Sequence, residues 1–506
     1  MSTAPVWSVD PRSGNPREQV AVEATAEEVD RAVRAAHSVR DALADRTARA
    51  AFLRTAAELL EESGAHIIEA ADAETALGPA RLTGELARTA AQLRSFAEVV
   101  EEGSHLDIRI DHEDGSRTPP WPDLRRWKIP LGVVAVYAAS NFPLAFSVPG
   151  GDTASALAAG CPVVIKAHPG HPATSELCAS VLRRAAARTG LPEDVVTLVH
   201  GFDAGVGLIR HPLVSAAGFT GSVRGGRALF DAAAARPVPI PFHGELGSLN
   251  PVVVTEAAAA ERAAEIGAGL GTSMTLGTGQ FCTKPGFVLA PAGGAGDHLV
   301  KALTETVSST GSGVMLDHRM RDAFLAGVRE RAGLPGVEAP VTPGAAGEHT
   351  VSAGFLTVPA DRLTAEGPHD ALLEECFGPV TVIARYATRD EAAAVLARLP
   401  GNLTATLQTA TEGEDPGAAG LLAALTPLAG RVLVNGWPTG VAVAPAQHHG
   451  GPYPATTSPT TSVGATAIER WLRPVTYQNT PDALLPPELR EDNPLGLPRR
   501  VDGRRA

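Results

Sequence analysis

One cysteine of this 506-residue chain lies in a segment that suits a reactive thiol. Cys282 stands in Gly277-Thr-Gly-Gln-Phe-Cys-Thr-Lys-Pro-Gly286, where glycine, threonine and proline predict a loop. A thiol on such a loop can be exposed and, once deprotonated, can act as a nucleophile. The other three cysteines lie beside apolar runs or within a helical pattern, which is typical of small core residues: Cys161, Cys178 and Cys376.

Two further polar residues could serve reaction chemistry at a carbonyl. Glu245 lies between Gly244 and Gly247, just before an apolar strand. Apolar surroundings would raise its pKa and make it a general base near neutrality, whereas a surface-loop glutamate is the plainer alternative. Asn141 follows a predicted strand that ends at Tyr137, so its amide could donate to a developing oxyanion. A turn or helix cap is the other interpretation of this asparagine.

A third set of residues could hold a nucleotide. Lys166 ends a predicted strand, where it can reach ribose hydroxyls or a phosphate or simply face solvent. Gly221 and Ser222 lie in a strand-to-helix turn that suits a pyrophosphate, although the turn is no G-x-G-x-x-G fingerprint. In Glu375-Cys-Phe377, the carboxylate could bind ribose hydroxyls and the ring could pack on a base or nicotinamide.

The elements around these residues alternate between strands and helices. Apolar runs predict strands at 132–137, 162–165, 195–199 and 216–220, with helices at 147–159 and 174–189. This βαβ rhythm predicts a doubly wound parallel sheet. Since ligands bind beyond the carboxyl ends of such strands, the candidate residues are expected at one edge of the sheet.

The rest of the chain predicts a helical start, a second α/β region and a tail. Helical patterns fill the first hundred residues, and a Pro-rich connection follows at 113–123. The segment 340–349 is expected to be a surface loop, and 481–506 a tail that lies on a neighbour or is partly disordered. The second region is predicted to hold a helix at 257–270 and strands at 251–254, 286–290, 380–386, 404–409 and 431–435.

Composition narrows the class of protein. The chain is 44% hydrophobic with a net charge of −13, which favours a globular protein over a disordered one and argues against a nucleic-acid partner. Four cysteines form no disulfide framework, and no apolar run reaches the ~18–20 residues of a membrane span. The N-terminus lacks an apolar signal core. We expect a soluble cytoplasmic enzyme or binding protein of about three domains, or one large enzyme built of several lobes.

Taken together, these segments resemble the aldehyde dehydrogenase superfamily over nearly the whole chain. The most specific are Glu245-Leu-Gly-x-x-Asn-Pro251 and Gly279-Gln-x-Cys282. The stretch from Ala139 to Gly160, with Asn435-Gly-Trp-Pro-Thr-Gly440 and His449-Gly-Gly-Pro-Tyr-Pro454, is similar to the branch of NADP-dependent fatty-aldehyde and α-ketoglutaric semialdehyde (2,5-dioxovalerate) dehydrogenases.

The resemblance implies an α/β fold with a Rossmann-type cofactor domain, a second α/β catalytic domain and a β-arm through which copies form a homodimer or homotetramer. The implied boundaries are 1–107 and 129–246 for the cofactor domain, 247–450 for the catalytic domain, 108–128 and 451–480 for the arm, and 481–506 for the C-terminal tail.

The resemblance also implies roles for the candidate residues. Cys282 would attack the aldehyde, Asn141 and the Cys282 backbone N–H would hold the oxyanion, and Glu245 would activate the water that hydrolyses the thioester. The cofactor would be held at the riboses by Lys166 and Glu375, at the pyrophosphate by Gly221 and Ser222, and on the nicotinamide side by Phe377.

One departure bears on the cofactor. Pro169 replaces the glutamate with which many family members select NAD, so NADP is favoured and NAD remains possible. His168 or Arg224 could help to hold the extra phosphate. The spacing of His168 and His171 suggests a metal pair, but no further ligand lies near them in the sequence, and we predict no metal site.

The substrate is left open between α-ketoglutaric semialdehyde and a medium- or long-chain aliphatic aldehyde. Apolar residues are expected to line the aldehyde channel: Leu144, Phe146, Phe281 and the loop 437–453. Lys284 could supply the cation that a substrate carboxylate needs, or face the cofactor or solvent. His448 and His449 could border the entrance or lie in a solvated loop. A CoA-acylating relative generally lacks Glu245, and a catalytically silent binding protein on the same fold would not need to keep Cys282.

Overall fold

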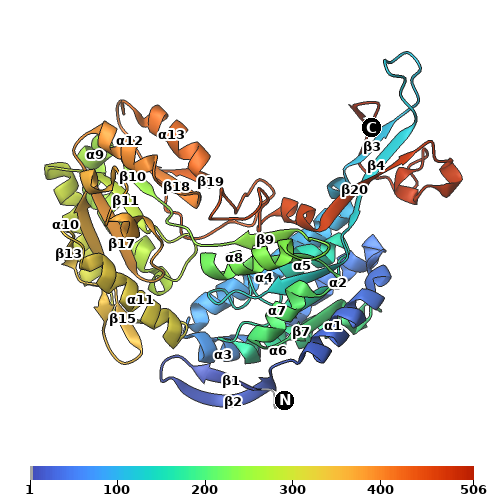
Figure 1. Cartoon of the computed structure of the whole chain (residues 1–506), viewed down its shortest axis with the longest axis horizontal. Coiled ribbons are helices and arrows are strands. Elements are labelled where there is room, and N and C mark those ends of the chain that lie inside the picture. Colours follow the sequence, from blue (N-terminus) through green and yellow to red (C-terminus); the bar gives the residue numbers. More distant parts are fainter. Residues whose placement is uncertain (1–3) are drawn as a thin grey trace.

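A computed structural model describes residues 4–506 and divides the chain into two lobes and an arm (Figure 1). The first lobe holds most of the chain up to β9, and the second holds β10 to β19. The arm, which contains β3, β4 and β20 to β22, projects from the first lobe. Within residues 4–506, no helix combines the length and the apolar character that a membrane span requires. The predicted α/β class is confirmed.

The first lobe is built on a five-stranded parallel sheet with the order β7-β6-β5-β8-β9. In chain order within the sheet this is 3-2-1-4-5, the arrangement of a Rossmann-type half, and its strand order reverses between β5 and β8. Each predicted strand is present within a few residues of its expected bounds. The strands are β5 (Val133–Tyr137), β6 (Val163–Lys166), β7 (Val196–Val199), β8 (Val214–Thr220) and β9 (Phe242–Glu245).

Helices cover this sheet. The helix predicted from residue 147 begins only at Gly151, because residues up to Gly150 form a tight turn in which a Cβ on Gly150 would lie 2.5 Å from the Ala145 carbonyl oxygen. The helices of the lobe are α1 (Ala26–Ser38), α2 (Arg46–Glu62), α3 (Gly64–Thr75), α4 (Pro79–Glu102), α5 (Gly151–Ala159), α6 (Pro172–Arg188), α7 (Phe202–Arg210) and α8 (Val223–Ala234).

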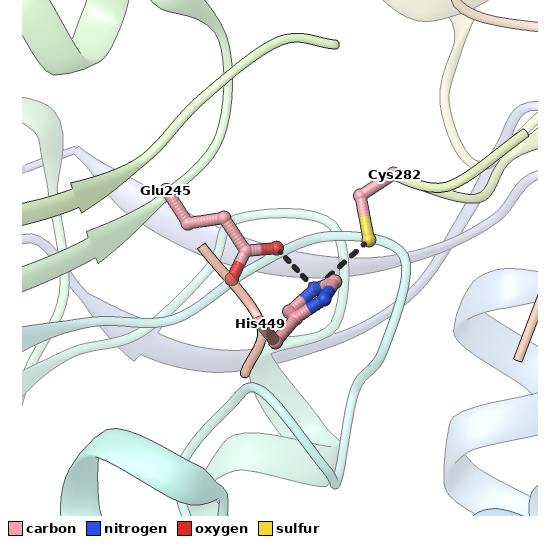
Figure 2. A group of neighbouring side chains, drawn as sticks. All are labelled: Glu245, Cys282 and His449. Carbon is pink, nitrogen blue, oxygen red and sulfur yellow. Dashed lines mark hydrogen bonds and ion pairs between the residues drawn. The ribbon is translucent and has the colours of Figure 1, made fainter. Parts of the chain in front are cut away.

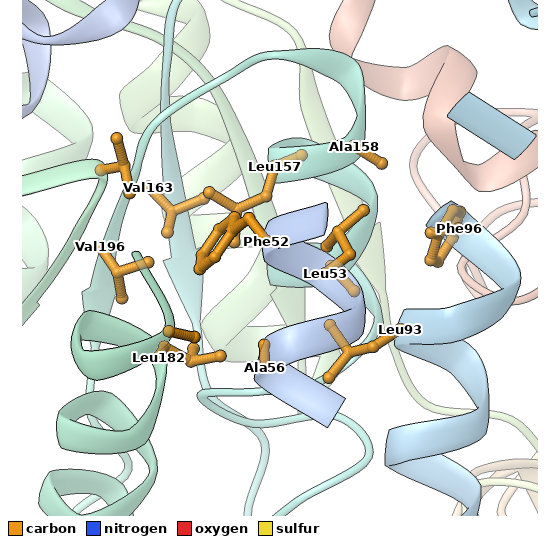
Figure 3. Close-up of a cluster of buried hydrophobic side chains, with 14 of the residues drawn as sticks. Phe52, Leu53, Ala56, Leu93, Phe96, Leu157, Ala158, Val163, Leu182 and Val196 are labelled. Carbon is orange, nitrogen blue, oxygen red and sulfur yellow. The ribbon is translucent and has the colours of Figure 1, made fainter. Parts of the chain in front are cut away.

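The main core of the first lobe lies where α2 and α4 pack on α5 and α6 (Figure 3). Phe52 and Leu53 of α2 and Leu93 and Phe96 of α4 are buried against Leu157 of α5 and their neighbours. Burial of one such side chain contributes roughly 1.5–3 kcal/mol to folding. This packing fixes α4, whose adjacent face turns toward the loop after β5.

The second lobe has a seven-stranded sheet with the order β13-β16-β17-β11-β10-β18-β19. All neighbours in it are parallel except β13 and β16. The expected loop at 340–349 is wrong in part, since β13 ends inside it and β14 lies within it. The strands are β10 (Val252–Val254), β11 (Phe287–Pro291), β13 (Glu338–Val341), β16 (Gly354–Pro359), β17 (Val380–Tyr386), β18 (Asn402–Gln408) and β19 (Ala429–Val434), with β12 (Gly313–Val314), β14 (Gly344–Ala345) and β15 (Thr350–Ser352) in a small separate sheet.

Helices also flank the second sheet (Figure 1). The helix predicted at 257–270 is confirmed and is longer than expected, because small residues continue its pattern to Thr275. The helices are α9 (Glu256–Thr275), α10 (Gly294–Ser308), α11 (His318–Ala332), α12 (Arg389–Leu396) and α13 (Ala418–Leu425).

The arm is a five-stranded sheet with the order β20-β4-β3-β21-β22. Its strands are β3 (Ile108–Asp111), β4 (Leu124–Pro130), β20 (Leu472–Gln478), β21 (Arg499–Val501) and β22 (Arg504–Arg505). The expectation of a loose tail at 481–506 is wrong, because β21 pairs with β3 and three leucines of the segment pack on Leu106 and Ile108: Leu485, Leu489 and Leu497. The tail thus completes the arm of its own chain.

The helical prediction for the first hundred residues missed a hairpin. β1 (Pro5–Asp10) pairs with β2 (Asn15–Val22) before the first helix begins. Most β2 residues are exposed, so its sequence carries no apolar alternation that would mark a strand. Residues 1–3 of the predicted first segment lie outside the described residues.

Candidate active site

Four of the predicted site segments meet at one edge of the first sheet. Parallel strands end at the same edge, and there lie Asn141 after β5, Lys166 at the end of β6, Gly221 and Ser222 after β8, and Glu245 at the end of β9. The cysteine loop comes from the second lobe and faces this edge. The site therefore lies between the lobes, beyond the carboxyl ends of the strands.

Glu245 is buried and fully engaged, with 1% of its surface exposed. Its Oε1 lies 3.0 Å from His449 Nε2, and its Oε2 accepts a hydrogen bond of 2.6 Å from the Ser462 hydroxyl. Burial alone would raise the pKa of Glu245, but His449, Ser462 and the charge of Arg470 together hold this pKa below its ordinary value. The raised pKa expected from the sequence is therefore wrong for this arrangement, because polar partners replace the apolar surroundings.

Cys282 follows α9 and a short 3₁₀ turn, Leu276–Gly279. Gly279 has a φ of +64°, and a Cβ there would lie 2.4 Å from the Gly378 backbone, so only glycine lets this loop pack so closely. Asn250 Nδ2 fixes the end of the loop by donating to the carbonyls of Cys282 (2.7 Å) and Lys284 (3.0 Å). The half-buried thiol is less exposed than predicted. Burial and then the Glu245 carboxylate raise its pKa well above the usual value, so it needs a nearby proton acceptor.

His449 supplies such an acceptor and was missed as a reactive residue. Its ring is buried, and Nε2 lies 3.6 Å from Cys282 Sγ and 3.0 Å from Glu245 Oε1 (Figure 2). Both contacts use the same nitrogen, so Nε2 can accept the thiol proton only when the ring proton is on Nδ1, and once protonated it can donate to the carboxylate. The solvated-loop alternative is wrong for His449. No local pattern marks it, because it follows Cys282 by 167 residues.

The segment that carries His449 is held against the edge strand of the first sheet. Leu246 N donates to the Ala455 carbonyl at 2.7 Å, and Thr457 N donates to the Gly244 carbonyl at 3.0 Å. The Thr461 hydroxyl accepts from the His449 backbone N–H at 2.8 Å. These bonds place a short stretch of chain alongside β9. His449 and Ser462 thereby come into contact with Glu245.

Asn141 lies beside the cysteine loop as predicted for an oxyanion donor. Its Nδ2 donates to the Gln280 carbonyl at 3.1 Å, two residues before Cys282. Its own backbone carbonyl accepts a 2.6 Å hydrogen bond from Arg81 Nη2 of α4. An amide has two N–H groups, so the second can serve a ligand while the first fixes the side chain.

The residues predicted to hold a nucleotide surround the start of α8. Ser222 caps this helix by accepting from Gly225 N at 3.2 Å, which leaves the N-terminal N–H groups to face an anion. Gly247 lies beside Val223 of α8 and opposite Glu375, where a Cβ would fall 2.5 Å from Glu375 Oε2. Glycine thus keeps room for that carboxylate. Burial raises the pKa of Glu375 to about 7, against the effect of nearby Lys284.

Lys166 and Phe377 complete the predicted set. Lys166 is half-buried, and burial together with the charge of Arg319 lowers its pKa to about 8. Phe377 is half-buried two residues after Glu375. A cationic lysine, a helix N-terminus and a carboxylate facing a glycine at the switch point of a Rossmann-type sheet fit a nicotinamide dinucleotide.

The histidines near Lys166 form no obvious ligand pair. The rings of His168 and His171 stack at 5.3 Å, and His171 Nε2 lies 2.8 Å from the Ala139 carbonyl oxygen. Burial lowers the pKa of His168 well below its usual value, so its ring is neutral and poorly suited to a phosphate. Arg224, in the first turn of α8, is exposed and so remains free to bind the extra phosphate of NADP.

Lys284 is not available as the cation for a substrate. Its Nζ is buried and donates to the carbonyls of Cys376 (3.1 Å) and Val380 (2.6 Å). The possible roles predicted toward a carboxylate or solvent are therefore wrong, since both hydrogen bonds hold loop backbone. Cys161 and Cys178 are buried as predicted, while Cys376 is half-buried.

The chain was compared with protein families and curated proteins. The model described as "Aldehyde dehydrogenase family" matches residues 2–472. The chain is 48% identical to α-ketoglutaric semialdehyde dehydrogenase 2 of Azospirillum brasilense, over 99% of this chain and 97% of that protein. It is 43% identical to α-ketoglutaric semialdehyde dehydrogenase of Acinetobacter baylyi, over 95% of this chain and 92% of that protein.

Solved structures share the fold. A glyceraldehyde-3-phosphate dehydrogenase from Methanocaldococcus jannaschii, complexed with NADP, superposes with a TM-score of 0.80 at 16% identity and covers 94% of this chain and 99% of its own. PnpE in complex with nicotinamide adenine dinucleotide gives a TM-score of 0.76 at 22% identity and covers 94% of each chain. The predicted two-lobed fold is confirmed by these likenesses.

Proposed function

The chain belongs to the aldehyde dehydrogenase family and oxidises aldehydes, and we propose that its substrate is α-ketoglutaric semialdehyde. The names of the two curated relatives support this choice because each matches nearly the whole chain. The single observation that carries the chemistry is the contact of Cys282 with His449 and Glu245 at the carboxyl edge of a Rossmann-type sheet. We propose that these residues, with Asn141, form the catalytic site.

The cofactor is proposed to be NADP. Lys166 and Glu375 would hold the riboses, Gly221 and Ser222 the pyrophosphate, and Phe377 the nicotinamide side. When bound, the nicotinamide ring supplies a hydride acceptor. Pro169 places no carboxylate where it would repel a 2′-phosphate, and Arg224 and Arg319 add positive charge near this end of the site. These features support NADP over NAD.

The first chemical step depends on removing the proton from Cys282. With the ring proton of His449 on Nδ1, the thiol proton moves from the sulfur to Nε2, 3.6 Å away, and the imidazolium that results donates from Nε2 to the Glu245 carboxylate. The thiolate then forms a carbon–sulfur bond to the aldehyde carbon, and the carbonyl π electrons move to the oxygen. Asn141 Nδ2 and the Cys282 backbone N–H hold this oxyanion.

The second half of the reaction releases the acid. After oxidation the acyl group remains on Cys282 as a thioester. Glu245 takes a proton from a water molecule as the water oxygen adds to the thioester carbon. The carbon–sulfur bond then breaks, the sulfur leaves as the thiolate, and the product departs as a carboxylate. Ser462 and His449 keep the Glu245 carboxylate ionised for this step.

The domain plan and the assembly are part of the same proposal. The cofactor domain would comprise 1–107 and 129–246, the catalytic domain 247–450, and the arm 108–128 and 451–480, which the segment 481–506 completes. In residues 4–506, β19 and β20 are outermost strands of their sheets and bond to no strand on their outer edges. Such edges suit pairing with a second copy, so a homodimer or homotetramer is expected from light scattering of the purified protein. A monomer at working concentration would contradict it.

The substrate and cofactor are tested together by measuring reduced cofactor with a panel of aldehydes. We expect the highest kcat/KM for α-ketoglutaric semialdehyde with NADP, and lower values for pentanal and a long-chain aldehyde. Turnover is expected without CoA, because Glu245 is present to activate water. A preference for an uncharged aldehyde, or a requirement for CoA, would overturn the proposed substrate or the hydrolytic step respectively.

A further inference from the structure

A cation on α4 lies near the nucleophile without any acceptor for its hydrogen bonds. The Nε and Nη2 atoms of Arg88 are buried, and neither has a partner within residues 4–506. The guanidinium instead lies over two aromatic rings, 5.4 Å from the centre of Phe146 and 5.8 Å from that of Phe142. A cation–π contact replaces only part of the lost hydration, so this group has unused capacity to bind an anion.

The charges around Arg88 leave a positive excess on this face. Arg81, Glu85 and Arg88 lie on one side of α4, next to the face that packs Leu93 and Phe96 into the core (Figure 3). Glu85 Oε1 accepts the backbone N–H groups of Leu144 and Ala145 at 2.8 and 2.9 Å. Among residues 4–506, no ion pair within 4.0 Å joins Glu85 to either arginine. Two guanidinium groups therefore lie near a single carboxylate, whose Oε1 is taken by the loop after β5 and whose Oε2 has no hydrogen-bond partner within residues 4–506.

The same face reaches the reactive cluster through Phe146. The Phe146 ring lies 6.1 Å from the His449 ring, and His449 Nε2 lies 3.6 Å from Cys282 Sγ. Arg88 is close enough for its charge to act on both Cys282 and Glu245. Phe146, one of the two rings under its guanidinium, is among the residues expected to line the aldehyde channel.

Other cations near the site each donate hydrogen bonds to backbone carbonyls, although Arg81 Nη1 and Arg431 Nε also lack a partner within residues 4–506. Both Nη atoms of Arg431 donate to carbonyls, at 3.0 Å to Gly440 and 2.5 Å to Pro438. Arg81 holds the Asn141 carbonyl, and Lys284 holds two loop carbonyls. Leu144, expected to line the channel, is instead part of the core of the first lobe.

From these contacts we propose that Arg88 binds the carboxylate at the far end of the substrate and so determines specificity for aldehydes that carry a terminal acid. The planar guanidinium offers two parallel donors that match a carboxylate, and Phe142 and Phe146 hold it in place. This inference rests on the proposed function, because it assumes that an aldehyde with a carboxylate reaches Cys282. It makes Arg88 a specificity residue that takes no part in the chemical steps.

The test compares two substrates in one variant. Arg88→Met keeps the length and apolar packing of the side chain but removes its charge and donors. For α-ketoglutaric semialdehyde we expect kcat/KM to fall about tenfold to a hundredfold, mainly through KM, since hydrogen bonds to charged groups have this effect. For pentanal, which has the same number of carbons, kcat/KM should change less than about twofold. Arg88→Lys should restore part of the loss, because it restores the charge without the forked donors.

A control on the same helix separates local from general effects. Arg94 pairs with Glu61 at 2.6 Å on the exposed side of α4, so Arg94→Met should alter neither substrate. An equal loss for both aldehydes in Arg88→Met, or no loss for either, would overturn the role of Arg88 while leaving the proposed substrate standing. A wild-type enzyme that prefers pentanal would instead refute the proposed substrate.

If Arg88→Met does not fold, product inhibition of the wild-type enzyme and of Arg88→Lys tests whether Arg88 binds the carboxylate. Under the proposal, the product α-ketoglutarate inhibits more strongly than pentanoate, and Arg88→Lys weakens inhibition by α-ketoglutarate alone. Equal inhibition by the two acids would overturn the proposal.

Discussion

Two cations lie near Cys282, the buried Lys284 and the half-buried Arg88, and their hydrogen bonds differ. Lys284, two residues after the cysteine, donates to two backbone carbonyls and so ties its loop to the segment before β17. Arg88, on α4, has no acceptor within the described residues and rests on aromatic rings. A cation that donates to two backbone carbonyls stabilises structure, whereas one that lacks acceptors is suited to a ligand. Its position close to Cys282 in the sequence favoured Lys284 as the cation that binds a substrate carboxylate. The hydrogen bonds favour Arg88 for this role.

The roles assigned to the two cations assume that the Cys282 sulfur is the reacting atom. Cys282→Ala removes the sulfur, so turnover with every aldehyde should be lost, because no covalent intermediate can form. Reduced cofactor is measured with each substrate, and binding of NADP by calorimetry shows that the site is intact. Turnover near the wild-type rate would mean that Cys282 is not the nucleophile. The contrast between Lys284 and Arg88 would then lose its basis.

The next largest effect is expected when the proposed general base, Glu245, is replaced. Glu245→Gln should reduce steady-state turnover by roughly 10²–10⁴-fold, while a first turnover still forms the thioester. Because the Glu245 carboxylate raises the pKa of Cys282, its removal should also lower that pKa. Alkylation of the thiol should then begin at lower pH than in the wild type. A shift to higher pH would mean that support of the His449 imidazolium outweighs the direct repulsion.

Lys284 is expected to affect stability and leave substrate choice unchanged. Lys284→Met leaves the carbonyls of Cys376 and Val380 without their donor, which should lower the free energy of unfolding by about 1–3 kcal/mol. Denaturant unfolding measures this loss. The ratio of kcat/KM between α-ketoglutaric semialdehyde and pentanal should stay within about twofold of the wild type. A selective loss of the charged substrate would reverse the roles assigned to the two cations.

The smallest effect concerns the pH dependence of the base. Ser462 donates a 2.6 Å hydrogen bond to Glu245 and helps to hold its pKa below the ordinary value. Ser462→Ala should therefore raise that pKa, and the fall of kcat on the acid side should move to higher pH by up to about one unit. The profile of kcat against pH gives the shift. Cys282 alkylation at high pH serves as the control, and an unchanged acid limb would show that Glu245 does not limit the rate there.

Much of the architecture could be predicted from the sequence because it depends on the local pattern of apolar and polar residues. The strands β5, β6 and β8 follow from apolar runs separated by helices, and such a rhythm has few possible arrangements. Glycine and asparagine spacing around Glu245 and Cys282 identified the family. The hairpin of β1 and β2 was missed because exposed strands carry no apolar alternation, and the packing of 481–506 was missed because its partners lie almost 400 residues away.

By itself, the sequence determined the α/β class, the family and the candidate residues Cys282, Glu245 and Asn141, since those follow from residue type and spacing. Only the tertiary structure decided which polar groups meet. It brought His449 onto both Cys282 and Glu245, lowered rather than raised the pKa of Glu245, and separated the roles of Lys284 and Arg88. The physical reason is that pKa values and hydrogen-bond satisfaction depend on neighbours in space, which here come from segments well separated in the sequence.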